Sequence, residues 1–208
     1  DAGHYYTLSG VVPNAGDIKF VPQRDIEYKQ EITDEDRTIL GKDVPDFTYG
    51  VNLSLQYKGF EFSMFGQGIS GTKVAFDVYG VHPFYHGQDS PRKYHLKRWT
   101  EENPNPHAAY PRIYSASSVH TTYNRNFSDY HLFDSDYFRF KTLSLGYTVP
   151  SATVKNWGLQ SLKVYVTGEN LFTVRADKKM EDFDPETAGG VIYTLGTKSV
   201  AFGVNISF

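Results

Sequence analysis

Two short patterns in the sequence contain the residue types that cofactor and metal sites use. Gly66, Gly68 and Gly71 have the G-x-G-x-x-G spacing of a dinucleotide-binding turn, and they follow a predicted strand. Such a turn belongs to a βαβ unit, but Thr72-Lys73-Val74-Ala75-Phe76 and a loop rich in Tyr, Pro and His follow instead. We therefore expect these glycines to let a strand leave the rim of a sheet.

The second pattern is a set of histidines. His82 and His86 are four residues apart, as in metal-binding pairs on a helix, and His95 follows. Pro83 lies between the first two and no acidic third ligand is near, so we expect a polar surface loop and no metal site. No Ser-His-Asp order, nucleophile elbow or pair of carboxylates stands out. The sequence predicts no catalytic residue, no enzymatic activity and no cofactor.

The composition excludes several classes of protein. A net charge of −3 and a pI near 6.2 leave no broad basic field, so nucleic acid is not an expected partner. The absence of cysteine excludes disulfides and thiolate metal sites. No apolar run approaches the roughly 20 residues of a membrane-spanning helix, whereas a barrel strand needs only about 10. The aromatic content of 16% is typical of barrels with aromatic girdles.

Alternating apolar and polar residues predict five β-strands. The last segment has apolar residues at every second position, namely Val200, Phe202, Val204, Ile206 and Phe208. The other segments are residues 49–57, 60–68, 137–149 and 162–172. In 137–149, strict alternation places Arg139 and Lys141 on the face of Leu143, so we expect its first half to extend beyond the hydrocarbon.

The connections between these segments alternate between short and long. Lys58-Gly59 and residues 150–161 are short links, whereas residues 71–136 and 173–199 are long and rich in turn-forming residues. Outer-membrane barrels have short periplasmic turns and long extracellular loops. The chain is thus predicted to be all-β, with transmembrane antiparallel barrel strands and with Phe208 on the periplasmic side.

Five strands cannot close a barrel by themselves. Such a sheet leaves two edges of unpaired backbone groups, which are costly in hydrocarbon. The smallest single-chain barrels have about 8 strands. We therefore expect residues 1–208 to be the C-terminal part of a larger barrel, with the other strands before Asp1, where no export signal is present.

Longer strings carry more information than the periodicity does. They are Asp17-Ile18-Lys19-Phe20, Asp36-Arg37-Thr38-Ile39-Leu40-Gly41, residues 47–60, Phe65-Gly66-Gln67-Gly68, residues 136–150, residues 164–172 and Phe183-Asp184-Pro185-Glu186. In order and spacing, these strings and the closing strand resemble the C-terminal end of SusC/RagA-type TonB-dependent outer-membrane transporters.

The resemblance implies a barrel of about 22 strands in the full protein, with an N-terminal plug and long extracellular loops. It also implies a SusD-like surface lipoprotein that acts as a hinged lid. Import of oligosaccharides or peptides would be driven by the TonB complex, which pulls on an N-terminal segment. Residues 1–208 would supply the last five strands and their loops in the bacterial outer membrane.

One stretch departs from the family pattern. Members often have a calcium-loop string, Asp-x-Asn-x-Asp-Gly, after the segment that matches Asp17–Phe20. Here the stretch is Val21-Pro22-Gln23-Arg24-Asp25-Ile26-Glu27, which has a proline, an arginine and no glycine. We do not predict calcium binding at this loop.

Two sets of residues are candidate functional sites, beside the apolar strand faces that would contact outer-membrane lipids. Val200, Phe202, Val204, Ile206 and Phe208 match a signal for the barrel-assembly machinery, since an exposed terminal strand can add to a sheet. Aromatic residues in the loop 71–136 are expected to stack on substrate or contact the lid lipoprotein, or else to pack the loop's own small core. These are Tyr79, Phe84, Tyr85, Tyr94, Trp99, Tyr110 and Tyr114.

Two other classes of protein fit part of the pattern. A soluble β-sandwich carbohydrate-binding module also alternates polar and apolar residues, and it would fold in water without detergent. An outer-membrane β-barrel enzyme would have catalytic residues at the rim. Neither class explains the uneven loop lengths together with a terminal Phe208. Transport is the leading hypothesis.

Overall fold

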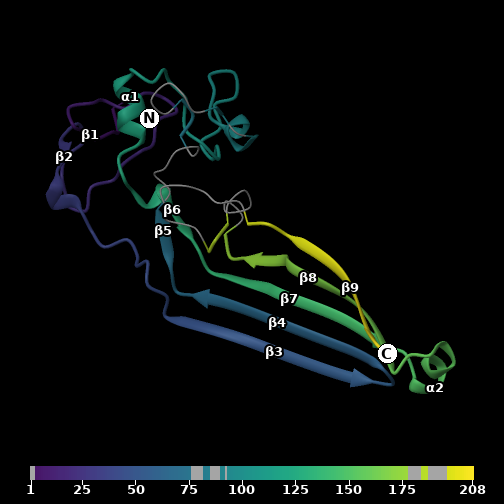
Figure 1. The fold of residues 1–208 in the computed structure, drawn as a ribbon. Helices are drawn as coiled ribbons and strands as arrows, with labels where there is room; N and C mark the ends of the chain where they lie inside the picture. Colours follow the sequence, from purple (N-terminus) through teal and green to yellow (C-terminus); the bar gives the residue numbers. More distant parts are fainter. Residues whose placement is uncertain (1–2, 76–81, 85–89, 92, 178–183, 187–195) are drawn as a thin grey trace. The chain divides into compact units, whose positions relative to one another are not determined.

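The computed structural model describes residues 3–75, 82–84, 90–91, 93–177, 184–186 and 196–208 (Figure 1). The strands are β1 (Thr7–Leu8), β2 (Glu31–Ile32), β3 (Phe47–Tyr57), β4 (Phe60–Ser70), β5 (Lys73–Ala75), β6 (Leu132–Asp134), β7 (Tyr137–Thr148), β8 (Ser161–Arg175) and β9 (Ser199–Ser207). The α-helices are α1 (Val119–Asn124) and α2 (Ser151–Val154), and the 3-10 helices are η1 (Asp34–Asp36), η3 (Lys93–Lys97), η4 (Asp129–His131) and η5 (Lys155–Trp157). Within these ranges, every helix is too short or too polar to cross a bilayer.

Five long strands form one antiparallel sheet in the order β3-β4-β7-β8-β9. They lie side by side in Figure 1, and each of the five predicted strands is confirmed. The largest difference in length is in β8, which continues past Phe172 to Arg175. Strands that follow one another in this order run in opposite directions, so the sheet is an up-and-down wall.

Both short connections lie at one end of this sheet, together with the C-terminus (Figure 1). The β3–β4 turn consists of Lys58 and Gly59, with φ of 47° and 88°. Two positive φ values define the type I′ turn, whose twist matches that of paired strands. The β7–β8 connection contains α2 and η5, and η5 is capped by Gly158 in the left-handed region, with φ of 72°. We call this end of the sheet the hairpin end and the opposite end the loop end.

A β-bulge at Lys141 reverses the alternation of β7. The pairings of β7 with β4 and with β8 both skip this residue. Leu143 and Phe138 therefore lie on one face of the sheet, although they are an odd number of positions apart. Arg139 lies on the opposite face, and the prediction that it shares a face with Leu143 was wrong.

The glycines of the G-x-G-x-x-G pattern do not release β4 from the sheet, because the strand continues beyond Gly66 and Gly68. That prediction was wrong for these two residues. A Cβ on Gly66 would come within 2.5 Å of Phe138 Cζ, and one on Gly68 within 2.7 Å of Tyr49 Cζ. The rings of Tyr49 and Phe138 stack across β4, with centroids 6.0 Å apart and planes at 5°. Gly71, with φ of 86°, follows the end of the strand.

The chain divides into two compact units. The sheet unit comprises residues 42–74, 133–188 and 193–208, and the loop unit comprises residues 1–41, 75–132 and 189–192. In the loop unit, β1 and β2 form a short parallel pair, and α1 is capped by the Ser118 hydroxyl, which accepts a hydrogen bond from the His120 N–H. The acidic residues 34–36 form η1, with Thr33 at its N-cap.

Few apolar side chains are buried within the described residues. The buried ones are Tyr110, Tyr123, Tyr137 and Val154. Many more large apolar side chains are exposed, most of them along the long strands. No second large sheet appears in the described part of the chain, and a β-sandwich requires one.

Candidate functional site

The apolar residues of the five long strands form one continuous face, which we call the apolar face. The register places the alternating apolar residues of paired strands opposite one another. Leu53, Val164, Val204 and Ile206 are exposed by 40%, 43%, 58% and 48%. A soluble sandwich would bury these side chains in a shared core. Within the described chain nothing covers this face.

Aromatic rings form a band across the apolar face at the loop end. Tyr49 stacks on Phe138, and Phe138 and Phe140 meet edge to face at 5.2 Å between centroids. Phe140 and Phe172 continue the band at 6.4 Å. The bulge at Lys141 makes this band possible, because it turns Phe138 and Phe140 toward the apolar face.

A second aromatic band lies at the hairpin end. The rings of Phe60 and Tyr147 are 4.6 Å apart, and the neighbouring Tyr57 is 70% exposed. On β3, Tyr49 belongs to the first band and Tyr57 to the second. The eight residue steps between them span roughly 27 Å along the strand, at about 3.4 Å per residue. The apolar face is thus a band of fixed height with aromatic borders.

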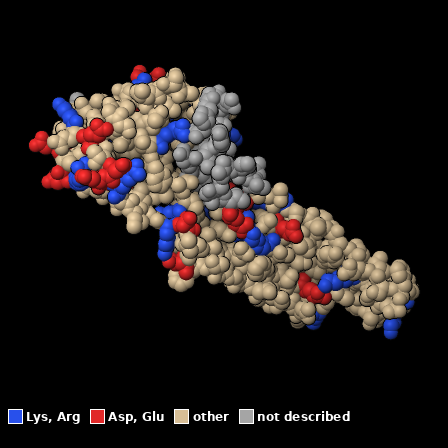
Figure 2. All heavy atoms as spheres, turned by 60° about the vertical axis from the view of Figure 1, so that its left-hand side comes forward, with Lys and Arg blue, Asp and Glu red and all other residues tan. Residues whose placement is uncertain are grey.

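The opposite side of the sheet is the polar face. Lys163 of β8 reaches across β7 to Glu61 of β4, with 2.5 Å between Nζ and Oε2. Gly146 of β7 leaves the room for the Lys163 side chain to cross. The hydroxyls of Ser144 and Thr167 are 3.0 Å apart on the same face. In Figure 2, acidic and basic side chains lie next to one another in small groups that uncharged surface separates.

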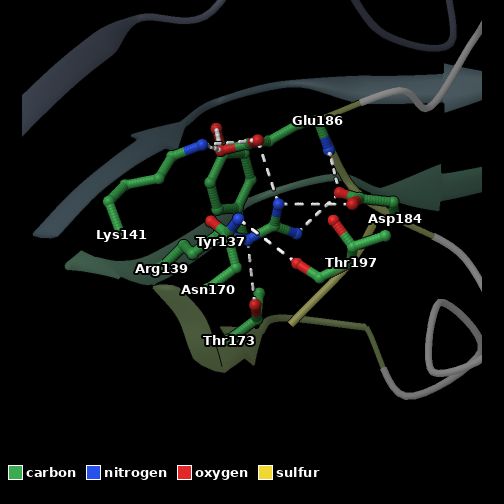
Figure 3. Close-up of polar contacts among 8 residues, drawn as sticks. All are labelled: Tyr137, Arg139, Lys141, Asn170, Thr173, Asp184, Glu186 and Thr197. Atoms are coloured by element: carbon green, nitrogen blue, oxygen red, sulfur yellow. Dashed lines mark hydrogen bonds and ion pairs between the residues drawn. The ribbon is translucent and has the colours of Figure 1, made fainter. Parts of the chain in front are cut away.

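Arg139 is the centre of a charged cluster at the loop end of the polar face (Figure 3). Its side chain is only 6% exposed. The Nε–H donates to the Thr173 hydroxyl at 3.0 Å. The two guanidinium nitrogens form ion pairs with Asp184 at 2.6 Å and with Glu186 at 2.9 Å. The cluster therefore joins β7 and β8 to a segment of the β8–β9 connection.

The two carboxylates of the cluster are themselves fully engaged. Burial opposes the charge of Asp184, but hydrogen bonds from Arg139 and from the Glu186 N–H outweigh it, so the pKa of Asp184 is lowered. Glu186 also pairs with Lys141 at 2.5 Å and accepts a hydrogen bond from the Tyr137 hydroxyl at 3.0 Å. Two acidic and two basic side chains thus neutralise one another.

A buried carboxylate organises the middle of the loop unit. Asp17, whose side chain is 0% exposed, accepts hydrogen bonds from the Asn14 N–H and the Asn124 side chain, both at 2.8 Å. His120 Nδ1 lies 2.8 Å from the same carboxylate, and its Nε2 lies 3.0 Å from the Asn14 side-chain amide. The Asp17–His120 pair resembles the base of a catalytic triad, but Asn14 occupies the position of a nucleophile. These contacts join residues 14–17 to α1.

A second buried carboxylate closes the loop that departs from the calcium pattern. Asp36 accepts hydrogen bonds from the N–H groups of Gln23, Arg24 and Thr33 and from the Arg24 guanidinium. Arg24 also pairs with Glu35 at 3.0 Å. The Arg24 side chain and then the Thr33 N–H hold the pKa of Asp36 well below its ordinary value. This loop carries its own cation, the guanidinium of Arg24.

Two curated proteins are similar to this chain in sequence. TonB-dependent receptor P3 of Formosa agariphila is 29% identical over 80% of the chain, and TonB-dependent receptor P26 of the same organism is 28% identical over 85%. The chain spans only 15% and 18% of their lengths. No protein-family model matches the chain.

Solved structures of one importer share the fold. The RagAB peptide importer in its open-open state matches 93% of the chain with a TM-score of 0.65 and 24% identity. A structure of the RagAB peptide transporter matches 79% with a TM-score of 0.56 and 25% identity. The chain spans 21% and 17% of those two chains. In sequence and in fold, this chain matches a portion of SusC/RagA-type TonB-dependent transporters.

Three of the predicted loop aromatics lie among other side chains of the loop unit. Trp99 contacts Gly16 and lies 5.7 Å from the Arg112 guanidinium, which also lies 5.2 Å from the Tyr114 ring. Tyr110 is buried, with its ring 4.6 Å from that of His95. These contacts fit the alternative in which the aromatics pack the loop's own core.

The remaining predicted loop residues divide into two groups. Phe84 is 41% exposed. Tyr79, Tyr85 and the side chain of Tyr94 lie outside the described residues, as does His86 of the histidine pattern.

His82 of the histidine pattern is buried, with its Nδ1 3.2 Å from the Tyr110 hydroxyl. The prediction that it lies on a polar surface was wrong. The described residues contain no group of three His, Cys, Asp or Glu side chains that could hold a metal ion.

Sequence patterns alone did not predict the cluster around Arg139. Asp184 and Glu186 belong to one of the strings that resemble the transporter family, and strict alternation placed Arg139 on the wrong face. The available signal was the pair of unmatched cations at Arg139 and Lys141, which require carboxylates from elsewhere in the chain.

Proposed function

We propose that this chain is the C-terminal part of the barrel wall of an outer-membrane, TonB-dependent importer. The observation that carries the proposal is the uncovered apolar face with an aromatic band at each end. Apolar surface of this extent on a soluble protein would cause aggregation. In a bilayer, lipid tails cover such a surface, and the backbone groups of paired strands form their hydrogen bonds within the sheet. At the tilt of about 35–45° that barrel strands have, the roughly 27 Å along β3 spans a height of about 19–22 Å, which is comparable with the apolar belt of outer-membrane barrels, about 25 Å tall.

The same geometry supports an orientation. TonB-dependent receptors are outer-membrane proteins. The hairpin end has the two short connections, and short turns face the periplasm in this class of barrel. The C-terminus would then be periplasmic, and the loop unit extracellular. In a protein of about 22 strands, the edges of β3 and β9 would pair with strands outside this chain.

The proposed activity is import of peptides or oligosaccharides together with a SusD-like lipoprotein. RagAB, whose chain shares the fold, is described as a peptide importer, which favours peptides as the first substrates to examine. Energy would come from the TonB complex through parts of the protein that lie outside this chain. The exposed, alternating residues of β9 support a role in recognition by the barrel-assembly machinery during biogenesis.

The loop unit would contact substrate or the lipoprotein through side chains that its own packing leaves exposed. Phe84, Leu96 and Phe127 are exposed by 41%, 77% and 56%. Buried Tyr110 and the packed Trp99 would support this surface from behind. The loop aromatics thus divide between contact and support.

Deletion of the full-length gene, with complementation, tests the proposed function. We expect the protein in the outer-membrane fraction with heat-modifiable mobility, co-purification of a SusD-like lipoprotein, and loss of growth on a defined set of peptides or glycans in the deletion strain. A protein found in the soluble fraction, or a deletion strain that takes up every tested substrate at the normal rate, would refute the proposal.

A further inference from the structure

The hydrogen bonds of Arg139 are those of a side chain that holds a segment in place. Its Nε, Nη1 and Nη2 groups all donate, to Thr173, Asp184 and Glu186. These are four hydrogen bonds from the five N–H groups of the guanidinium, and only 6% of the side chain is exposed. A bidentate guanidinium fixes both the distance and the plane of its partner carboxylate. Arg139 is therefore suited to positioning rather than to binding a ligand.

Two described parts of the β8–β9 connection, residues 184–186 and 196–197, meet at this cluster. Residues 184–186 supply the two carboxylates. Residues 196–197 return beside them, with Gly196 packed so closely against Asp184 that a Cβ would collide with the carboxylate. The Asn170 side chain, on β8, donates to the Thr197 carbonyl at 3.4 Å. Figure 3 shows these side chains converging from β7, from β8 and from the connection.

The bulge at Lys141 decides on which side of the wall this occurs. Phe138 and Phe140 lie on the apolar face, so Arg139, between them, points to the polar face. If the apolar face contacts lipid, as the proposed function states, the polar face lines the interior of the barrel. Residues 184–186 are consequently on the interior side.

We propose that Arg139 is a positioning residue that holds residues 184–186 and 196–197 against the interior wall, so that they line the extracellular mouth of the barrel. This inference rests on the proposed function. The two acidic and two basic side chains neutralise one another, so this part of the mouth offers a rigid and nearly uncharged surface to an imported substrate. Residues 184–186 and 196–197 thus lie inside the opening and narrow it.

Hydrogen–deuterium exchange of the full-length transporter in nanodiscs tests whether Arg139 holds residues 184–186 and 196–197 in place. In Arg139→Gln, peptides with Glu186 and with residues 196–198 should exchange about tenfold faster or more, since a buried charge loses its partner. Compared with Arg139→Gln, Arg139→Lys should restore part of the protection, because lysine keeps the positive charge but cannot form the bidentate hydrogen bonds of the guanidinium. Lys163→Gln, which breaks the other ion pair of the polar face, should leave these peptides unchanged. Glu186→Gln serves as second variant if Arg139→Gln fails to assemble.

Cysteine labelling tests the interior placement separately. Pro185→Cys, in a background without other reactive cysteines, should react slowly with a bulky, membrane-impermeant maleimide on whole cells, and quickly once Arg139→Gln is added. Phe84→Cys marks the rate of an exposed loop position. Unchanged exchange in Arg139→Gln, or labelling of Pro185→Cys as fast as Phe84→Cys in the wild-type background, would overturn the inference. A transporter absent from the outer membrane would instead refute the proposed function before any variant is compared.

Discussion

The sheet unit and the loop unit reach stability by different means. In the sheet unit, neighbouring strands pair over nine to eleven positions in sequence order, and the side chains on its apolar face remain exposed. In the loop unit, two buried carboxylates each have several hydrogen-bond partners: Asp17 contacts His120 and Asn124 of a distant segment, and Asp36 accepts from residues 23, 24 and 33 of its own loop. The wall depends on its surroundings, whereas the loop unit depends on its own polar contacts. Substitutions should therefore affect the two units in different ways.

A charge in the middle of the apolar face should have the largest effect. Leu53→Lys places a cation halfway between the aromatic bands, which costs about 2–4 kcal/mol at the bilayer midplane. The adjacent Ser54→Lys, on the polar face, should be tolerated. We expect heat-modifiable, folded protein in the outer membrane to fall sharply for Leu53→Lys only. Equal loss for both variants would show that the two faces do not differ.

Loss of a buried carboxylate should unfold part of the loop unit and leave the wall intact. Asp36→Asn removes the charge that the Arg24 guanidinium and three N–H groups share. Limited proteolysis of the full-length protein should show faster cleavage within residues 21–36, with unchanged heat modifiability. Asp34→Asn, which affects only an exposed pair with Arg37, is the matched control. Cleavage that does not change would mean that Asp36 does not hold this loop.

A side chain at Gly66 should disturb the aromatic band without preventing barrel formation. Gly66→Ala places a Cβ within 2.5 Å of the Phe138 ring, and overpacking of this kind costs about 1–3 kcal/mol. Gly50→Ala is the control, because its Cβ would meet ordinary contacts at 3.6 Å. The temperature at which heat modifiability is lost should fall for the first variant only. A similar decrease in both would point to strand propensity instead of ring packing.

The loop unit should be as stable at mildly alkaline pH as at neutral pH, and it should lose stability as the pH rises above about 10. Burial, aided by the charge of Asp17, raises the pKa of Tyr123 to about 12. An acid whose folded pKa exceeds its unfolded value of about 10 contributes its full stability below pH 10 and loses it as pH rises toward 12. Proteolysis of the loop unit should accelerate over this range in the wild type. Tyr123→Phe should weaken the pH dependence, and an identical profile in this variant would exclude Tyr123 as its source.

The sequence determined the strands, their antiparallel order and the hairpin at Lys58-Gly59, because alternation and turn chemistry are local properties. It also carried the resemblance to SusC/RagA-type transporters through strings such as Asp17–Phe20. Only the tertiary structure decided which face Arg139 occupies. One bulge reverses the alternation of β7, and no local sequence pattern predicts that bulge. Likewise, Asp17 pairs with His120 and Glu61 pairs with Lys163, and in each pair the two residues are more than 100 positions apart in the sequence. Such contacts depend on how the chain returns in space, which residue spacing does not encode.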